Sequence, residues 1–189
     1  MFLKRFLDLL FSLILLLLLG LPMTVIGICV ALTSKGGALF KQKRVGRSGK
    51  SFTCYKFRTM YIDAPRDRPT SSFFDAEKYI TPVGRILRRS SLDELPQLFN
   101  VLMGDMSLVG PRPLMTGEGE IHELRRRCGV YGIRPGITGL AQVNGRDMLD
   151  DITKARLDAR YARSVSLSED TRIILKTLSG AFTGRGVLR

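Results

Sequence analysis

Two adjacent carboxylates, Asp93 and Glu94, follow directly after an arginine-rich stretch that contains Arg85, Arg88 and Arg89. Acids in the first turn of a helix often do no more than complement the helix dipole. Beside an arginine cluster, however, the free N–H groups of a helix start form a site for phosphate. A carboxylate held there stays ionised and can attack phosphorus, while its neighbour holds a Mg²⁺ that screens the repulsion. The pair therefore predicts phosphoryl-transfer chemistry.

The surrounding residues predict two helices that meet at this acidic pair. Thr81 followed by Pro82 is typical of a helix N-cap and first turn. A second helix is expected to begin between Ser91 and Asp93. Ser91 and Glu94 form a capping-box pattern, whereas Pro96 fits the first turn better if Asp93 is the cap. Both alternatives place the acids at a helix N-terminus, with a buried face formed by Leu95, Leu98, Phe99 and Leu102.

Two segments rich in glycine and proline carry further anion-binding candidates. Arg112 lies between two prolines in residues 104–113, so little backbone entropy is lost when its guanidinium is presented to phosphate. Residues 134–139 predict a turn, residues 140–143 a short strand, and Asn144 with Gly145 a tight turn that leads to Arg146. Each segment taken singly is also typical of a solvated basic loop.

Residues 9–32 form a stretch of 24 residues without a charge. A helix of that length spans about 36 Å, enough for a hydrocarbon core of roughly 30 Å. Lys4 and Arg5 resemble the basic start of a signal peptide, but the apolar stretch is too long for one and no Ala-x-Ala cleavage site follows it. The sequence therefore predicts a membrane anchor.

Basic residues lie on both sides of this anchor, and Pro22 lies near its middle. Basic flanks prefer the cytoplasmic side, so a straight span would place one basic cluster on the wrong face. Proline removes a helical hydrogen bond, and a helix that bends at Pro22 and leaves on the side it entered satisfies both flanks. The alternative is a kinked spanning helix, because membrane helices tolerate proline and glycine.

The charge balance predicts an anionic partner. The chain carries 30 Lys and Arg against 17 Asp and Glu, a net charge of +13, and residues 33–69 alone carry ten basic and two acidic residues. Their place beside the membrane segment favours anionic lipid or a phosphorylated lipid over nucleic acid. The absence of Trp argues further against stacked bases, the single His excludes a His-rich zinc site, and three isolated cysteines indicate a cytosolic domain.

The remaining pattern predicts an α+β fold in two parts, an anchoring re-entrant helix over residues 1–34 and a compact, mostly helical cytosolic domain over residues 35–189. Residues 45–49 are expected to form the turn of a short β-hairpin. Apolar residues recur at helical spacing after residue 146, and the helix that begins near Ser168 has Ile174 and Leu178 on one face together with residues 181 and 182. Such helices could pack on the core or lie on the membrane surface. Residues 125–127, three consecutive arginines, are expected to be solvated or lipid-facing.

Several motifs occur together and in a fixed order: KRFLD from Lys4, QKRVG from Gln42, YKFRTM from Tyr55, SLDELPQL from Ser91, GDMSLVGPRP from Gly104, RPGITG from Arg134 and QVNGR from Gln142. With this ordered set the chain resembles the bacterial sugar transferases, in particular the small monotopic polyprenyl-phosphate phosphoglycosyl transferases. The resemblance extends over nearly the whole chain.

The resemblance implies a reaction, namely transfer of a phospho-sugar from a UDP-sugar to undecaprenyl phosphate with release of UMP. It implies Mg²⁺ dependence, a re-entrant helix, and a catalytic domain on the cytoplasmic face of the bacterial inner membrane. Asp93 would be the nucleophile and would hold the metal together with Glu94, while Arg88, Arg112, Asn144 and Arg146 would bind substrate. Anionic membrane lipids and downstream glycosyltransferases are the further partners expected.

Two features depart from the family pattern. Small members often carry Ser before the membrane proline, whereas this chain has Leu21, so a hydroxyl of Ser12 or Thr24 is expected to help at the bend. Residues 114–120 have no clear family signature. Two rival functions are a conventional glycosyltransferase, which would release UDP, and a non-enzymatic membrane adaptor, which would have no need of Asp93 and Glu94 beside arginines.

Overall fold

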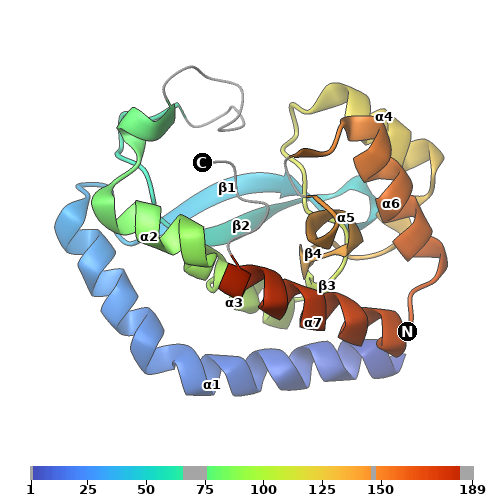
Figure 1. The fold of residues 1–189 in the computed structure, drawn as a ribbon, viewed down its shortest axis with the longest axis horizontal. Helices are drawn as coiled ribbons and strands as arrows, with labels where there is room; N and C mark the ends of the chain where they lie inside the picture. The colour runs from blue at the N-terminus through green and yellow to red at the C-terminus, as the bar shows by residue number, and fades with distance from the viewer. Residues whose placement is uncertain (1, 66–75, 146–147, 184–189) are drawn as a thin grey trace.

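A computed structural model of the chain describes residues 2–65, 76–145 and 148–183, and in these ranges the protein is mainly helical with two small sheets (Figure 1). This confirms the predicted α+β class. The helices are α1 (Phe2–Thr33), α2 (Pro82–Ser90), α3 (Gln97–Met103), α4 (Gly119–Arg127), α5 (Leu140–Val143), α6 (Asp151–Arg163) and α7 (Leu167–Thr183). The strands are β1 (Leu39–Val45), β2 (Ser51–Phe57), β3 (Ser107–Val109) and β4 (Gly136–Thr138).

Strands β1 and β2 form the predicted hairpin. They pair antiparallel, with Leu39 opposite Phe57 at the open end and Val45 opposite Ser51 at the turn. Alternation along β2 sends its side chains to two different cores. Phe52 and Cys54 pack in one core with residues of α3 and the segment after it, whereas Phe57 packs against α1 and α2. The hairpin therefore links the apolar anchor to the rest of the domain.

Strands β3 and β4 form a short parallel pair in which Ser107 lies opposite Gly136. This corrects the sequence-based expectation, which placed a turn at residues 134–139 and a strand at 140–143; the latter residues form α5. The backbone of β4 lies so close to Gly110 that a Cβ on Gly136 would come within 2.0 Å of the Gly110 nitrogen. Glycines that look like turn residues in the sequence here permit a close approach of two backbones.

Helix α1 bends along its length, and Figure 1 shows two arms that run along adjoining sides of the domain. Pro22 lies inside the helix, and proline is the usual cause of a sharp kink. The second arm packs through Met23 and Val30 against Phe57 and α2. In the turn that contains Pro22, the Thr24 hydroxyl donates to the Gly20 carbonyl at 2.9 Å, and the expected help of a hydroxyl from Ser12 or Thr24 at the bend stays a prediction.

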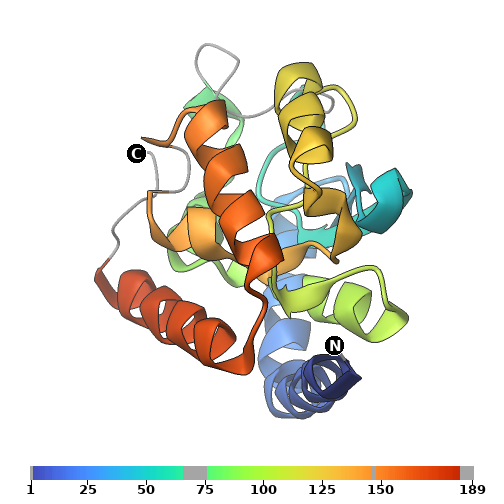
Figure 2. The ribbon, with the colours of Figure 1, turned by 90° about the vertical axis from the view of Figure 1, so that its right-hand side faces the viewer.

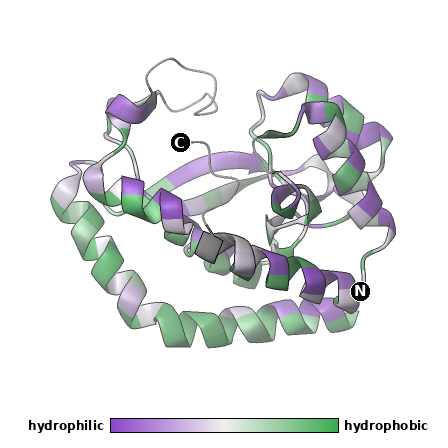
Figure 3. Ribbon diagram, viewed as in Figure 1, coloured by the Kyte–Doolittle hydropathy of each residue, from purple (hydrophilic) through white to green (hydrophobic). Residues whose placement is uncertain are grey.

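Among the described residues, α1 is the one helix long and apolar enough to cross a membrane, and only 11% of its most apolar window is buried in the domain. Leu17, Leu18 and Leu21 are exposed. Figure 3 shows apolar residues along most of α1 and apolar residues interspersed with polar ones in α7. In α7 the exposed apolar side chains include Ile174 and Leu178, while Ile173 is buried. Seen from the side, α7 runs past the first arm of α1 (Figure 2).

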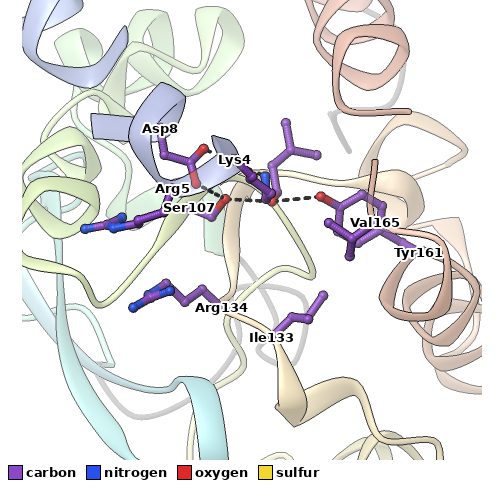
Figure 4. Close-up of a pocket in the computed structure, with 9 residues that line it drawn as sticks. Lys4, Arg5, Asp8, Ser107, Ile133, Arg134, Tyr161 and Val165 are labelled. Carbon is purple, nitrogen blue, oxygen red and sulfur yellow. Dashed lines mark hydrogen bonds and ion pairs between the residues drawn. The ribbon is translucent and has the colours of Figure 1, made fainter. Parts of the chain in front are cut away.

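The first turns of α1 are fastened to the domain by a set of buried polar side chains, which we call the anchor cluster: Lys4, Asp8, Ser107, Tyr161 and Asp170 (Figure 4 shows all but Asp170). The Lys4 ammonium lies 2.6 Å from an Asp170 oxygen, and the Tyr161 hydroxyl donates to the other Asp170 oxygen at 2.5 Å. The Asp8 carboxylate accepts from the Ser107 hydroxyl at 2.8 Å and from the backbone amide of residue 108 at 3.2 Å.

Next to the anchor cluster, Arg5 donates to the carbonyls of Val101 and Met106 at 2.8 and 3.2 Å. The Val101 carbonyl, near the C-terminal end of α3, accepts from the Gly104 amide as well, and Met106 lies in the segment that follows α3. Both arms of α1 therefore contact residues beyond position 34. The predicted division of the chain at residue 34 into an anchor and a catalytic domain stays a prediction.

Candidate active site

The acidic pair lies in a single 3₁₀ turn, Leu92–Glu94, between α2 and α3. Helix α2 begins as predicted, because the Thr81 hydroxyl accepts from the Gly84 amide at 2.9 Å. Both predicted N-caps of the second helix, Ser91 and Asp93, are wrong. Ser91 has a φ of 57° and makes no side-chain cap bond, and its amide donates to the carbonyls of the last turn of α2. Helix α3 begins only at Gln97. The acids therefore do not lie in the first turn of an α-helix.

Glu94 is held by two cations that come from different parts of the chain. The Lys56 ammonium, on β2, lies 2.6 Å from Oε1 of Glu94, and Nη1 of Arg112 lies 3.1 Å from the same oxygen. Burial by itself raises the pKa of this carboxyl, but Lys56 and Arg112 outweigh burial and hold the pKa of Glu94 well below its usual range. Glu94 is therefore a fixed anion at neutral pH.

Asp93 differs sharply from its neighbour. Among the described residues, no hydrogen bond to its carboxylate is formed, although the side chain is half-buried. Burial, with the Glu94 charge in addition, raises the pKa of Asp93, while the positive charges of Lys56, Arg88 and Arg112 lower it. These cations, rather than the helix start that the sequence predicted, favour the ionised form. A carboxylate with unused lone pairs among cations is suited to attack phosphorus.

The structure brings Arg88 and Arg112 to the acidic pair, and their role as substrate contacts stays a prediction. Nε of Arg88 donates to the Thr59 hydroxyl at 2.9 Å, which fixes the side chain, and the Arg88 charge acts on Asp93. Burial lowers the pKa of the Arg88 guanidinium. The Arg112 side chain is 43% exposed, so its guanidinium can meet a ligand from solvent. Together with Lys56, these two arginines place their positive charges around the acidic pair.

Of the other two predicted binding residues, Asn144 is not seen in contact with the acidic pair. The side-chain amide of Asn144 donates to the Leu140 carbonyl at 2.7 Å, a contact local to α5. Arg146 lies outside the described residues. Both remain predictions as substrate contacts.

Sequence reasoning missed Lys56 as a member of the site. Alternation along β2 puts Lys56 on the same face as Phe52 and Cys54, which are both buried, and this was the signal that could have identified it. The arginine run at 125–127 was also misjudged in part. Arg125 is only 3% exposed, whereas Arg126 and Arg127 are exposed and pair with Glu123 on the helix surface.

The acidic pair is compatible with Mg²⁺. Among the described residues, no group of three or more His, Cys, Asp or Glu side chains could enclose a metal. Magnesium, however, is commonly held by only one or two carboxylates together with substrate phosphates and water. Both cations that contact Glu94 do so through Oε1, so its second oxygen is the one that a metal could use. The pair alone would be an incomplete cage that a phosphorylated ligand completes.

Residues 1–184 match the family model described as bacterial sugar transferase. The chain belongs to the bacterial sugar transferase family. The match includes α1, the acidic pair and every later helix and strand, so the long apolar helix is part of the region that defines the family.

Several curated relatives share this sugar transferase region. The galactosyl transferase CpsE of Streptococcus agalactiae is 40% identical over 97% of this chain and 43% of its own length. The undecaprenyl-phosphate galactose phosphotransferase of Salmonella typhimurium is 40% identical over 93% of this chain and 40% of its own length. The exopolysaccharide production protein ExoY of Rhizobium meliloti is 35% identical over 97% of this chain and 87% of its own length. The chain thus spans less than half of the first two relatives and most of the third.

Proposed function

We propose that the protein transfers a phospho-sugar from a UDP-sugar to undecaprenyl phosphate and releases UMP. Family membership and relatives named undecaprenyl-phosphate galactose and glucose phosphotransferases support this class of reaction. The observation that carries the proposal is the division of roles within the acidic pair. Glu94 is held by Lys56 and Arg112, whereas Asp93 keeps its carboxylate oxygens for a reacting group.

In the first step, an Asp93 oxygen attacks the phosphorus that bears the sugar. A P–O bond to Asp93 forms, the P–O bond to the other phosphate breaks, and UMP leaves with that electron pair. In the second step, an oxygen of undecaprenyl phosphate attacks the same phosphorus and displaces the Asp93 carboxylate. The product is an undecaprenyl diphosphate-linked sugar, and the enzyme returns to its starting state without net proton uptake.

Two steps suit a site that must process two anions. A direct transfer would bring the lipid phosphate and the nucleotide diphosphate together at once, and their charges repel. A covalent intermediate on Asp93 lets UMP leave before the lipid phosphate enters. Lys56, Arg88 and Arg112 compensate the charge of each anion in turn. Asp93 and Glu94 would hold Mg²⁺, which when bound neutralises charge on the diphosphate.

We also propose that α1 is re-entrant and that the domain lies on the cytoplasmic face of the membrane. Both arms of α1 contact the same domain, while Leu17, Leu18 and Leu21, close to Pro22 in the sequence, are among its most exposed residues. This arrangement leaves the bend free to enter the lipid. The exposed apolar side chains of α7 and the basic residues of β1 would contact the interface and its anionic headgroups.

Cysteine labelling in intact cells tests this topology. Single cysteines are placed at residues 2 and 36 in a background that lacks Cys29, Cys54 and Cys128. Neither site should react with an impermeant reagent from outside. Labelling of either site from outside would refute the re-entrant arrangement, and Pro22→Ala should shift the chain toward such labelling because it restores the helical hydrogen bond.

A product assay tests the reaction. The full chain in membrane nanodiscs is incubated with Mg²⁺, undecaprenyl phosphate and a panel of UDP-hexoses and UDP-N-acetylhexosamines. The proposal requires UMP as the nucleotide product with at least one donor, and the panel also identifies the sugar. UDP as the product would instead indicate a conventional glycosyltransferase. A lack of turnover with every donor, while anionic lipid is bound, would favour the adaptor. Capture of the lipid product by downstream glycosyltransferases would follow from the reaction.

A further inference from the structure

Behind Arg112 lies a buried ion pair that the proposed mechanism does not use. Arg125 of α4 and Asp158 of α6 are 3% and 1% exposed, and Nη2 of Arg125 lies 2.5 Å from an Asp158 oxygen. A buried charge pair of this kind is seldom required for stability, because well-packed apolar residues can often replace both partners without loss. Stability alone therefore does not explain the presence of this buried pair.

That reason lies at the other end of the Arg125 guanidinium. Nη1 of Arg125 donates to the backbone carbonyl of Arg112 at 2.8 Å. The Arg112 side chain in turn reaches Glu94 at 3.1 Å. The contacts thus run without interruption from Asp158 through Arg125 and Arg112 to Glu94.

Each contact in this series is suited to fix the orientation of the next group. The planar guanidinium has donors at fixed angles, so a carboxylate at one nitrogen sets the direction in which the other nitrogen points. Arg112 lies between Pro111 and Pro113, whose rings restrict the neighbouring backbone. With the Arg112 carbonyl fixed, the point from which its half-exposed side chain leaves the backbone is fixed as well.

We propose that Arg125 and Asp158 are positioning residues that orient Arg112 toward the phosphate-bearing ligand and Glu94. The inference rests on the proposed function, since it assigns Arg112 an anionic substrate. Neither residue touches that substrate. The competing account is that the pair merely joins α4 to α6, and the two accounts differ in whether the effect of the pair depends on Arg112.

The test is a double-mutant cycle on the full chain in nanodiscs. The pair is replaced by apolar residues, Arg125→Met with Asp158→Leu, in the wild-type background and in an Arg112→Gln background. Arg126→Met is the matched control, because Arg126 is a neighbour on α4 whose side chain is 71% exposed. The readouts are the thermal midpoint, the dissociation constant for UDP, and kcat and KM for UMP release.

Positioning predicts that the paired replacement keeps a thermal midpoint close to wild type but lowers kcat by about 10- to 100-fold, the range expected when a charged group is displaced by around an ångström. UDP binding should weaken in parallel. In the Arg112→Gln background the same replacement should change both readouts less than about twofold, because residues that act through one another are not additive. Arg126→Met should match wild type.

Unchanged kcat and UDP affinity in the paired replacement would overturn the inference, and so would an equal loss in both backgrounds. If the paired replacement does not fold, Arg125→Lys takes its place in the same cycle, because lysine keeps the charge opposite Asp158 but has no planar fork for a second partner. Failure of the proposed function is recognised separately, since the wild-type chain would then release no UMP with any donor, whatever its affinity for UDP.

Discussion

The anchor cluster and the acidic site are built from the same parts and differ in what they leave unused. Each has two carboxylates and a lysine 2.6 Å from one of them. In the anchor cluster both Asp8 and Asp170 accept hydrogen bonds from neighbours, so each charge is compensated inside the protein. In the acidic site Glu94 is compensated in this way, while among the described residues Asp93 accepts no hydrogen bond.

The positively charged side chains of the two clusters also differ in their exposure to solvent. The Lys4 side chain is 14% exposed and is committed to Asp8 and Asp170. The Arg112 side chain is 43% exposed, and its charge acts on the acidic pair together with those of Arg88 and Lys56. Buried paired charge therefore does not by itself distinguish chemistry from anchoring. Within the described residues, the distinguishing features are a carboxylate that accepts no hydrogen bond and an exposed arginine side chain beside it.

The largest expected effect comes from changing the Asp93 carboxylate, which is the proposed reacting group of the acidic site. Asp93→Asn should reduce UMP release by about 10³-fold or more, the scale for loss of a nucleophile. Asp170→Asn, the matched change in the anchor cluster, should leave turnover per folded protein within about tenfold of wild type. Initial rates of UMP release, normalised to folded protein, measure both. Similar losses in the two variants would show that the clusters do not divide the work as described.

The second effect concerns stability, where we expect the anchor cluster to matter most. Asp8→Ala should lower the free energy of unfolding by about 2 kcal/mol, since it removes the carboxylate that accepts from the Ser107 hydroxyl and the amide of residue 108. Asp151→Ala, at an exposed ion pair on α6, should change it little. Chemical denaturation in detergent measures both. A loss for Asp8→Ala no greater than that for Asp151→Ala would mean that the anchor cluster does not fasten α1.

The third effect is a shift in pH dependence. Asp93 must be ionised to attack, so turnover falls as the pH falls through its pKa, which burial already raises above the usual range. Lys56→Met removes a cation that lowers this pKa and should move the acid limb of the rate profile to higher pH, whereas Lys56→Arg should keep it near the wild-type position. A shift to lower pH, or none, would contradict the assigned role of Lys56.

The sequence could predict those features that depend on nearby residues. The long apolar helix with Pro22, the hairpin and the Thr81 cap all follow from patterns within a few positions of each other. The arginines at 88 and 112 were identified as anion-binding candidates, and the structure places their charges beside Asp93.

The features that were missed depend on distant contacts or on competition between local ones. Lys56 and Glu94 are 38 positions apart, and Arg125 and Asp158 are 33 apart, so no local pattern links them. The sequence around Ser91 fits a helix N-cap. In the structure its backbone amide instead donates to carbonyls in the last turn of α2, and Ser91 is the C-cap of that helix. The residues of β4 were predicted to form a turn because glycine is common in turns. In the structure, Gly136 instead permits the close approach of the β4 backbone to Gly110.

The central claim is that Asp93 carries the phospho-sugar, and intact-protein mass spectrometry tests it most directly. The wild-type chain is incubated with an accepted UDP-sugar and Mg²⁺ in the absence of undecaprenyl phosphate. The account predicts a mass increase of one phospho-sugar that maps to Asp93, about one equivalent of UMP, loss of the adduct when the lipid is added, and no adduct in Asp93→Asn. A wild-type enzyme that turns over without any adduct, or an adduct on another residue, would contradict it.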